Sequence, residues 1–97
     1  MRVITRKKLM EFAKKHLNAE TALDTWYRET KKSNWKTIAE VKKSFPHADA
    51  VGKCTVFNIG GGNYRLITKI SYRRSIVYLR FVLLHKDYDR GDWKHDC

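Results

Sequence analysis

Apolar residues recur three and four positions apart in two segments near the start of the chain, as on the buried face of a helix. The first segment carries Leu9, Phe12, Ala13 and Leu17, and the second carries Leu23, Trp26, Tyr27 and Thr30. Thr5 is a suitable N-cap for the first helix, whereas Asn18 breaks the pattern and can cap the second. The pattern therefore predicts a helical hairpin.

Shorter elements flank this hairpin. The Val3-Ile4 pair favours a short strand before the first helix. The residues Thr37-Ile38-Ala39-Glu40 fit a capping box, in which the threonine and glutamate side chains bond to backbone N–H groups at a helix start. We therefore expect a short third helix that runs to about Phe45, where Pro46 stops it.

The second half of the chain, up to about Leu84, is rich in Val, Ile, Phe and Tyr with turn residues between the apolar runs. This pattern predicts strands at 54–59, 63–72 and 75–84. Helices that precede a run of strands predict an α+β fold, with the helical hairpin packed on one face of a small twisted antiparallel β-sheet. We expect one domain over residues 1–97, with residues 90–97 as a tail for which the pattern predicts no structure.

The two turns between these strands fix which residues lie opposite one another, and alternation assigns each residue to a face. If Tyr72 lies opposite Ser75, then Arg65 pairs with Val82, Ile67 with Arg80, and Lys69 with Tyr78. If Ile59 lies opposite Tyr64, then Asn58 pairs with Arg65, Val56 with Ile67, and Cys54 with Lys69. The predicted core face collects Phe57, Ile59, Tyr64, Leu66, Ile70, Val77, Leu79, Phe81 and Leu83. The predicted outer face collects Cys54, Val56, Asn58, Arg65, Ile67, Lys69, Tyr78, Arg80 and Val82, which places three cations around a tyrosine.

The charge of the chain and the distribution of its basic residues give this outer face a candidate function. The chain has 21 Lys and Arg against 10 Asp and Glu, a formal net charge of +11. No acidic residue lies between Asp49 and Asp87, although the interval holds the basic residues Lys53, Arg65, Lys69, Arg73, Arg74, Arg80 and Lys86. An unopposed positive field indicates a site for a polyanion, either nucleic acid or an acidic protein, and an ordinary solvated surface is the alternative.

Composition excludes several classes of protein. No apolar run approaches the roughly 18 residues that a membrane span needs, and the basic N-terminal segment lacks the apolar core of a secretion signal. We expect a cytoplasmic protein that does not contact a membrane.

Cys54 and Cys97 have no CxxC or Cys/His neighbours, so neither a zinc site nor a disulfide framework is predicted. Cys54 is interpreted as a small buried hydrophobe and Cys97 as an exposed free thiol.

Candidate chemistry follows the last predicted strand. His85 can transfer protons near neutral pH, Tyr88 can stack on a base or donate a hydrogen bond, and arginine binds phosphate through its planar fork. These residue types without paired carboxylates or metal ligands are typical of a ribonuclease that uses no metal or other cofactor and takes the RNA 2′-hydroxyl as its nucleophile. The alternative is an ordinary pair of side chains at a strand end.

Several segments resemble one known family. They are Trp26-Tyr27, Asn34-Trp35-Lys36, Phe57-Asn58-Ile59-Gly60-Gly61, Tyr64-Arg65-Leu66, Lys69-Ile70, Arg80-Phe81-Val82, and His85 followed by Tyr88-Asp89. In order and content these segments are similar to the HigB toxins of the RelE/ParE superfamily, which belong to bacterial type II toxin–antitoxin systems. The resemblance extends from Arg2 to about Asp89. One departure is the Leu83-Leu84 pair, where the family typically has Gly-Thr before the histidine.

The resemblance implies an mRNA interferase, an endoribonuclease that cleaves message during translation in the A site of the 70S ribosome. It also implies silencing by a HigA-type helix-turn-helix antitoxin, in a toxin–antitoxin heterotetramer. By similarity, Arg65 and Arg80 would bind the scissile phosphate, His85 would be the general acid or base, and Tyr88 would contact the cleaved nucleotide. The products would be a 2′,3′-cyclic phosphate and a 5′-hydroxyl.

Further RNA contacts are expected outside this catalytic set. Lys69 is a candidate because the predicted register places it on the outer face with Arg65 and Arg80. The complete set of expected RNA-binding residues is Lys53, Asn58, Lys69, Arg73, Arg74 and Lys86. Two other functions stay open on the sequence alone: a non-catalytic module that binds RNA or the ribosome, and a ParE-like inhibitor of gyrase.

Overall fold

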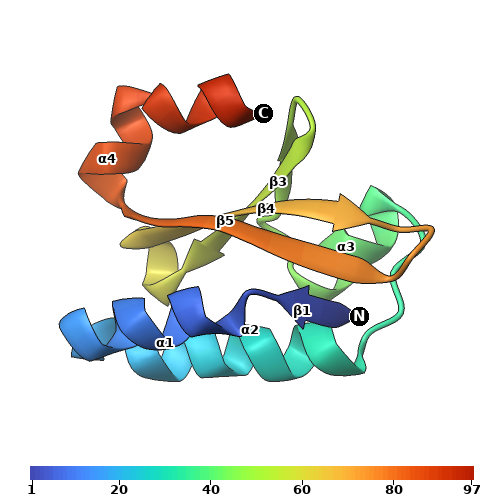
Figure 1. The fold of residues 1–97 in the computed structure, drawn as a ribbon, viewed down its shortest axis with the longest axis horizontal. Coiled ribbons are helices and arrows are strands. Elements are labelled where there is room, and N and C mark those ends of the chain that lie inside the picture. The colour runs from blue at the N-terminus through green and yellow to red at the C-terminus, as the bar shows by residue number, and fades with distance from the viewer.

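A five-stranded sheet with the order β1-β5-β4-β3-β2 forms the centre of the computed structural model, which describes residues 1–97 (Figure 1). The strands are β1 Arg2–Ile4, β2 Asp49–Val51, β3 Cys54–Ile59, β4 Tyr64–Ser71 and β5 Ile76–Leu84. Neighbours from β2 to β5 pair antiparallel, whereas β1 pairs parallel with β5. The strand predicted at Val3-Ile4 and the three main strands are confirmed, and β2 is an additional edge strand. The sheet is therefore mixed rather than wholly antiparallel.

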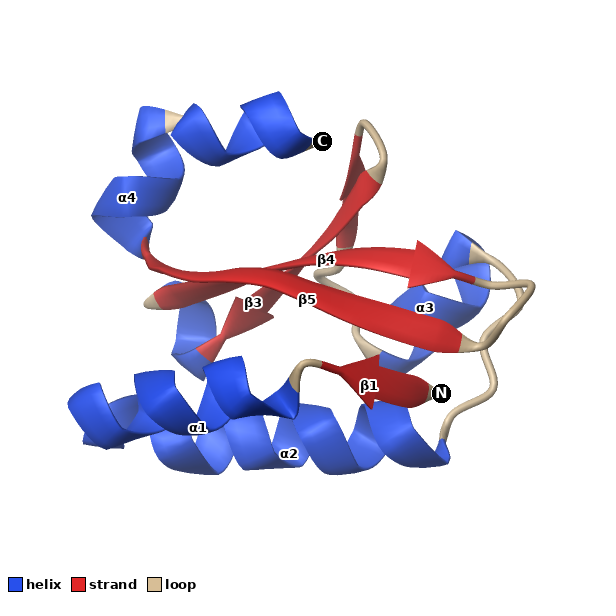
Figure 2. Ribbon diagram, in the orientation of Figure 1, coloured by secondary structure: helices blue, strands red, loops and turns tan.

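Two helices cover one face of this sheet. Helices α1 (Arg6–Lys15) and α2 (Glu20–Lys32) run side by side below it in Figure 2, which confirms the helical hairpin. Asn18 does not cap α2, because it lies inside the 3-10 turn η1 (Leu17–Ala19) that joins the helices. The capping box at Thr37 is confirmed, since its side chain accepts a hydrogen bond from the Glu40 N–H at the start of α3 (Ile38–Ser44). None of these helices is long and apolar enough to cross a membrane.

The main core lies between the helical hairpin and the sheet. Leu23 and Trp26 of α2 are almost fully buried, and the Trp26 ring meets Phe57 of β3 edge to face with centroids 5.4 Å apart. Leu66 of β4 and Val77 of β5 complete the buried layer beneath the helices. The helical spacing in the first third of the chain thus supplies one wall of the core and the strand alternation supplies the other, which confirms the α+β prediction.

Strand register agrees with the prediction over most of the sheet. The pairing of β3 with β4 is confirmed, with Asn58 opposite Arg65, and the pairing of β4 with β5 is confirmed at the turn end, with Lys69 opposite Tyr78. A shift between Ile67 and Thr68 then adds one residue, Arg80, to β5. Because such a bulge adds a residue to β5 alone, each β5 side chain after Arg80 lies on the face opposite to the predicted one.

The shift corrects three face assignments in β5, those of Phe81, Val82 and Leu83. Phe81 and Leu83, which were predicted for the core under the helices, pack instead with Val56 and Ile67 on the opposite face. Val82 and Leu84 pack against the main core in their place. The expected pairings of Arg65 with Val82 and of Ile67 with Arg80 are therefore wrong: Leu83 and Phe81 are the partners.

The end of the chain folds back over the face that the helical hairpin leaves open. Helix α4 (His85–Arg90) and the 3-10 helix η3 (Asp92–Asp96) lie above the sheet in Figure 1, and the C-terminus returns toward the turn between β2 and β3. Trp93 anchors this segment, since it is only 4% exposed in a cluster with Val56 and Ile67. Residues 90–97 are thus a structured cover, which the sequence pattern did not predict.

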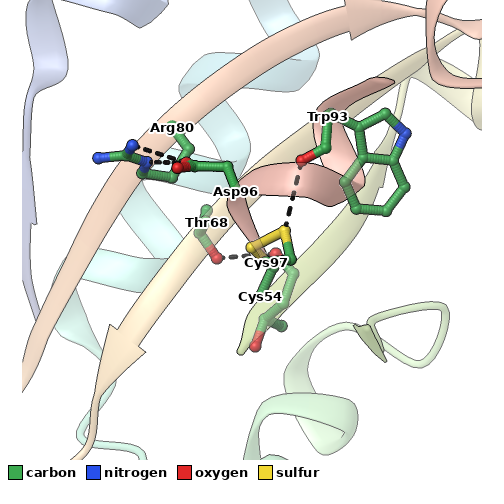
Figure 3. Close-up of a disulfide and its surroundings, with 7 residues drawn as sticks. Cys54, Thr68, Arg80, Trp93, Asp96 and Cys97 are labelled. Carbon is green, nitrogen blue, oxygen red and sulfur yellow. Dashed lines mark hydrogen bonds and ion pairs between the residues drawn. A yellow bond between two sulfur atoms is a disulfide. The ribbon is translucent and has the colours of Figure 1, made fainter. Parts of the chain in front are cut away.

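A disulfide between Cys54 and Cys97 fixes the end of this cover to β3 (Figure 3). The Lys53 N–H also donates a 2.8 Å hydrogen bond to the Cys97 carbonyl. Gly52 has a φ of +57°, and a Cβ there would lie 2.6 Å from the same carbonyl oxygen. Cys54 is buried as expected, but the prediction that Cys97 is an exposed free thiol is wrong. The 43-residue separation carried no signal for pairing, because only the fold of the tail brings the two sulfurs together.

Candidate nucleic-acid interface

Arg65 projects from β4 near the glycine turn and is held by backbone oxygens. Its Nη1 donates hydrogen bonds to the carbonyls of Gly62 and Tyr64. Its guanidinium carbon lies 5.0 Å from the centroid of the Tyr88 ring, in a cation–π contact. Because these contacts fix the side chain while leaving its charge uncompensated by any carboxylate, Arg65 is pre-oriented for an anion.

Helix α4 brings His85 and Tyr88 to the same place. The two residues are three positions apart in the helix, so they are neighbours on its surface. The His85 N–H donates to the Asn63 carbonyl, which ties the start of α4 to the turn that carries Arg65. The His85 Nδ1 lies 2.9 Å from Oδ2 of Asp89, and both side chains are more than half exposed. A carboxylate that holds Nδ1 sets the ring orientation and leaves Nε2 facing outward for proton transfer.

Tyr88 is partly covered by the tail. Its ring stacks on Trp93 with centroids 4.9 Å apart and an interplanar angle of 15°. Trp93 Nε1 donates a 2.9 Å hydrogen bond to the Tyr88 carbonyl, which strengthens the same contact. With Trp93 stacked on the ring and Arg65 in cation–π contact with it, the Tyr88 hydroxyl is the better placed part of the side chain for a nucleotide.

Arg80, the inserted residue of the bulge, is engaged by the tail (Figure 3). Its Nε and Nη2 each lie 2.6 Å from Oδ2 of Asp96. Lys69 of β4 and Lys8 of α1 add to the positive potential at this carboxylate. Lys8 also donates a 3.0 Å hydrogen bond from Nζ to the Arg80 carbonyl, so it supports the bulge itself. These cations come from three elements and converge on one anion.

The pKa of Asp96 reflects this surrounding charge. The hydrogen bond from Arg80 lowers the pKa below its ordinary value of 3.8, and the charges of Arg80, Lys69 and Lys8 act in the same direction. Burial opposes them only in part. Asp96 is therefore a carboxylate at neutral pH, and it contradicts the expectation that no acid neutralises the outer-face cations.

The predicted outer face is thus divided. Ile67 lies between Arg65 and Lys69 on this face of β4, and it is fully buried in the cluster that contains Trp93. Arg65 belongs to the end with His85 and Tyr88, whereas Arg80 and Lys69 belong to the end with Asp96. Three of the four predicted catalytic residues therefore lie together, and the fourth, Arg80, is held by Asp96 of the tail.

The other expected RNA-binding residues are all exposed. Lys53, Asn58 and Lys86 are exposed, in the β2–β3 turn, on β3 and on α4 respectively. Arg73 and Arg74 are exposed in the β4–β5 turn, at the opposite end of the sheet from α4. No group of three or more His, Cys, Asp or Glu side chains is placed to hold a metal ion.

Sequence reasoning missed three residues of this region: Lys8, Asp89 and Asp96. The four-residue spacing of His85 and Asp89 was a usable signal, because residues four apart on a helix contact each other. Lys8 and Asp96 gave no such signal, since both reach Arg80 through tertiary packing.

Comparison with known proteins identifies the family. The HigB toxin family, described as the RelE-like toxic component of a toxin–antitoxin system, matches residues 19–91. The chain is 32% identical over 92 residues to the mRNA interferase toxin HigB of Escherichia coli K12, covering 92% of this chain and 88% of the relative. It is 29% identical over 93 residues to the mRNA interferase HigB of Escherichia coli O6:H1, covering 93% and 90% of the two chains. A match of this extent, over a fold that was expected on independent grounds, shows that the chain belongs to the HigB toxin family and is the toxic component of a toxin–antitoxin pair.

Proposed function

We propose that this toxin is an endoribonuclease that cleaves mRNA without a metal cofactor and so stops translation and growth. Two relatives that it matches over about nine-tenths of their length are named mRNA interferases. Its basic surface suits a polyanionic substrate, because phosphate contacts dominate the affinity of proteins for nucleic acids. The observation that carries the proposal is the contact of Arg65 with Tyr88, one helical turn from a His85 whose Nδ1 is held by Asp89.

The proposed reaction uses the RNA's own 2′-hydroxyl. Its oxygen attacks the adjacent phosphorus, the bond from phosphorus to the 5′-oxygen breaks, and the products are a 2′,3′-cyclic phosphate and a 5′-hydroxyl. His85 takes the 2′-hydroxyl proton or supplies one to the leaving oxygen. Arg65, and Arg80 once Asp96 has left it, stabilise the extra negative charge on the phosphate, as fixed donors do.

The remaining residues bind and position the RNA. The Tyr88 hydroxyl contacts the cleaved nucleotide, since Trp93 already covers one face of the ring. Lys69 adds a phosphate contact beside Arg80, and Lys53, Asn58, Arg73, Arg74 and Lys86 contact the flanking backbone. Asp89 keeps the imidazole oriented. The whole chain, residues 1–97, acts as one domain in this scheme.

The partners follow from the same proposal. We place the activity in the cytoplasm, on message in the 70S ribosome, and the silencing partner is a HigA-type helix-turn-helix antitoxin that forms a heterotetramer with the toxin. Met10 and Leu17 are apolar yet 52% and 73% exposed, beside a groove between α1 and α2. Exposed apolar side chains of this kind mark a contact surface for another protein. The antitoxin therefore has an apolar place to dock that is distinct from the RNA site.

Product analysis tests the proposal. The protein, with its Cys54–Cys97 disulfide reduced, is incubated with RNA in the presence and in the absence of ribosomes. The ends of the RNA fragments are then identified by mass spectrometry. Free RNA, or message already released from ribosomes, is also incubated in EDTA. We expect cyclic phosphate ends, activity that persists in EDTA, and strongly weakened cleavage in Arg65→Ala. Arg28→Ala, an exposed arginine on α2, is the matched control and should cleave normally.

Each alternative gives a different result. A module that only binds RNA or the ribosome would leave the RNA uncut but would still bind to it or to the ribosome. A gyrase inhibitor would leave RNA intact and arrest DNA supercoiling. Activity on free RNA that EDTA removes and magnesium or manganese restores would contradict the metal-independent chemistry.

A further inference from the structure

The tail places a carboxylate where the proposed function needs a phosphate. Asp96 Oδ2 accepts a hydrogen bond from Nε of Arg80 and forms an ion pair with Nη2, the same planar fork that binds phosphate oxygens. Lys69 and Lys8 add positive charge at this point. An RNA phosphate and the Asp96 carboxylate cannot occupy the Arg80 fork together, so they compete.

The ion pair between Arg80 and Asp96 alone holds the tail in place only weakly. The Arg80 and Asp96 side chains are 40% and 32% exposed, and pairs of this exposure favour their closed form only about two- to five-fold. Asp96 is, however, the neighbour of Cys97, which is covalently joined to Cys54 on β3. A covalent anchor one residue away raises the effective concentration of the carboxylate at Arg80 far above that of a free chain end.

The other contacts of the tail do not depend on the disulfide. Trp93 stays packed on the sheet through its own burial and its hydrogen bond to the Tyr88 carbonyl. Opening the disulfide therefore leaves residues 94–97 held by non-covalent contacts, such as the Lys53 hydrogen bond to the Cys97 carbonyl and the Arg80 ion pair, while α4 and its catalytic side chains keep their places. The disulfide therefore restrains the segment next to Arg80, whereas Trp93 holds α4.

We propose that residues 94–97 form a redox-controlled strap: with the Cys54–Cys97 disulfide closed, Asp96 occupies the phosphate-binding fork of Arg80 and blocks RNA, and reduction releases it. This inference rests on the proposed function, because it takes Arg80 as the phosphate ligand. Disulfides in cytoplasmic proteins are usually transient or redox-sensing rather than structural, which fits such a switch.

The reduction step needs a dithiol protein or small dithiol as reductant. One of its thiolates attacks Cys97, because Cys54 is 1% exposed and Cys97 is only partly buried. The S–S bond breaks, a mixed disulfide forms, and the second thiol of the reductant resolves it. Two electrons and two protons pass to the toxin, so Cys54 and Cys97 become thiols and the reductant becomes a disulfide.

Binding to an uncleavable probe tests the strap directly. The probe is a short 2′-O-methyl RNA, which carries the phosphates but lacks the nucleophile. Its affinity is measured for the oxidised and the dithiothreitol-reduced protein, with the redox state checked by alkylation and mass. We expect reduction to tighten binding by at least about ten-fold. Cys97→Ser should bind as tightly as the reduced protein under both conditions, and oxidised Asp96→Asn should bind tightly despite its disulfide.

Asp92→Asn is the matched control, because Asp92 lies in the same tail but pairs with Arg90. It should keep the full redox response. Equal affinity of the oxidised and reduced wild-type proteins would overturn the strap, and so would weak binding by oxidised Asp96→Asn.

Cleavage of ordinary RNA by the same proteins separates the two proposals. If no reduced protein cuts RNA although probe affinity still follows the redox state, the catalytic proposal fails and the strap stands. If every protein cuts RNA equally in both redox states, the strap fails and the catalytic proposal stands.

Discussion

The guanidinium of Arg65 lies against the ring of Tyr88, with Cζ 5.0 Å from the ring centroid, although the two residues belong to different elements. This contact joins β4 to α4 at the point where the main chain leaves the sheet. It aligns the fixed positive charge with the tyrosine hydroxyl and with His85 on the same helix. The geometry of the proposed site therefore depends on how α4 packs, and Trp93 secures that packing.

Tyr88→Phe tests whether the hydroxyl or the ring matters. Phenylalanine keeps the stack on Trp93 and the contact with Arg65, so the melting temperature should not change. Loss of a hydrogen bond made in the transition state should slow single-turnover cleavage by about 100-fold. Tyr88→Ala should also destabilise the fold by about 1 kcal/mol, because the aromatic stack is lost. Normal cleavage by a folded Tyr88→Phe protein would leave the hydroxyl without a catalytic role.

Arg80→Ala tests the other end of the site. The backbone carbonyl that accepts from Lys8 is unaffected, so the bulge and the thermal stability should persist. Growth arrest and cleavage by the reduced protein should fall by at least about 100-fold, since a fixed donor to the phosphate is gone. Arg65→Ala should weaken toxicity strongly as well. A toxic, well-folded Arg80→Ala protein would remove this residue from the site.

The strands could be predicted from the sequence because alternation and turn residues agree. The β3–β4 register follows from the Gly60–Gly62 turn, whose glycines all have positive φ, a conformation that few other residues adopt. The β4–β5 register could be predicted only near its turn. Beyond Arg80 every residue up to Leu84 is apolar, so the pattern contains no alternation that would reveal the one-residue bulge.

The position of the C-terminal tail could not be predicted from the sequence, for a different reason. Arg65, Arg80, His85 and Tyr88 could be selected from residue chemistry and from the family resemblance. Their division into two groups could not, because it arises from Trp93, Asp96 and Cys97 reaching distant residues through tertiary packing. The family match also ends at Gly91, before the strap residues begin.

Salt dependence separates residues that bind RNA from residues that act on it. Each neutralised phosphate contributes about −0.7 to the log–log slope of affinity against salt on a single strand. Substituting both Arg73 and Arg74 by alanine should lower affinity and reduce the slope by about 1.4, while bound RNA is still cut. His85→Ala should leave affinity and slope nearly unchanged and end cleavage. Filter binding across a salt series, paired with single-turnover cleavage, measures both effects; normal cleavage by His85→Ala would move the proton transfer to Tyr88 or a lysine.

Leu17→Asp tests the proposed antitoxin surface. Leu17 is 73% exposed in the turn between α1 and α2, and these two helices lie on the side of the sheet opposite α4 (Figure 1). A charge introduced into an apolar contact should weaken antitoxin binding by at least about ten-fold while RNA cleavage stays normal. Asn18→Asp adds the same charge at the neighbouring exposed position and is the matched control. Calorimetry with the cognate antitoxin measures the difference, and unchanged affinity in Leu17→Asp would place the antitoxin elsewhere.

The pH dependence of the strap follows from the lowered pKa of Asp96. Arg80 donates to this carboxylate, and Arg80, Lys69 and Lys8 all face it with positive charge, so its pKa lies below the ordinary 3.8. A depressed carboxyl pKa stabilises the closed form fully above the ordinary value, and the stabilisation is lost as pH falls through the lowered pKa. The oxidised strap should therefore stay closed from about pH 5 to 9 and loosen only in strong acid. Carbon-detected NMR of the Asp96 carboxyl should show a pKa below 3.8 in the oxidised protein and a higher value in Arg80→Ala; an Asp96 that titrates at the same pH in both proteins would mean that Arg80 does not hold it in solution.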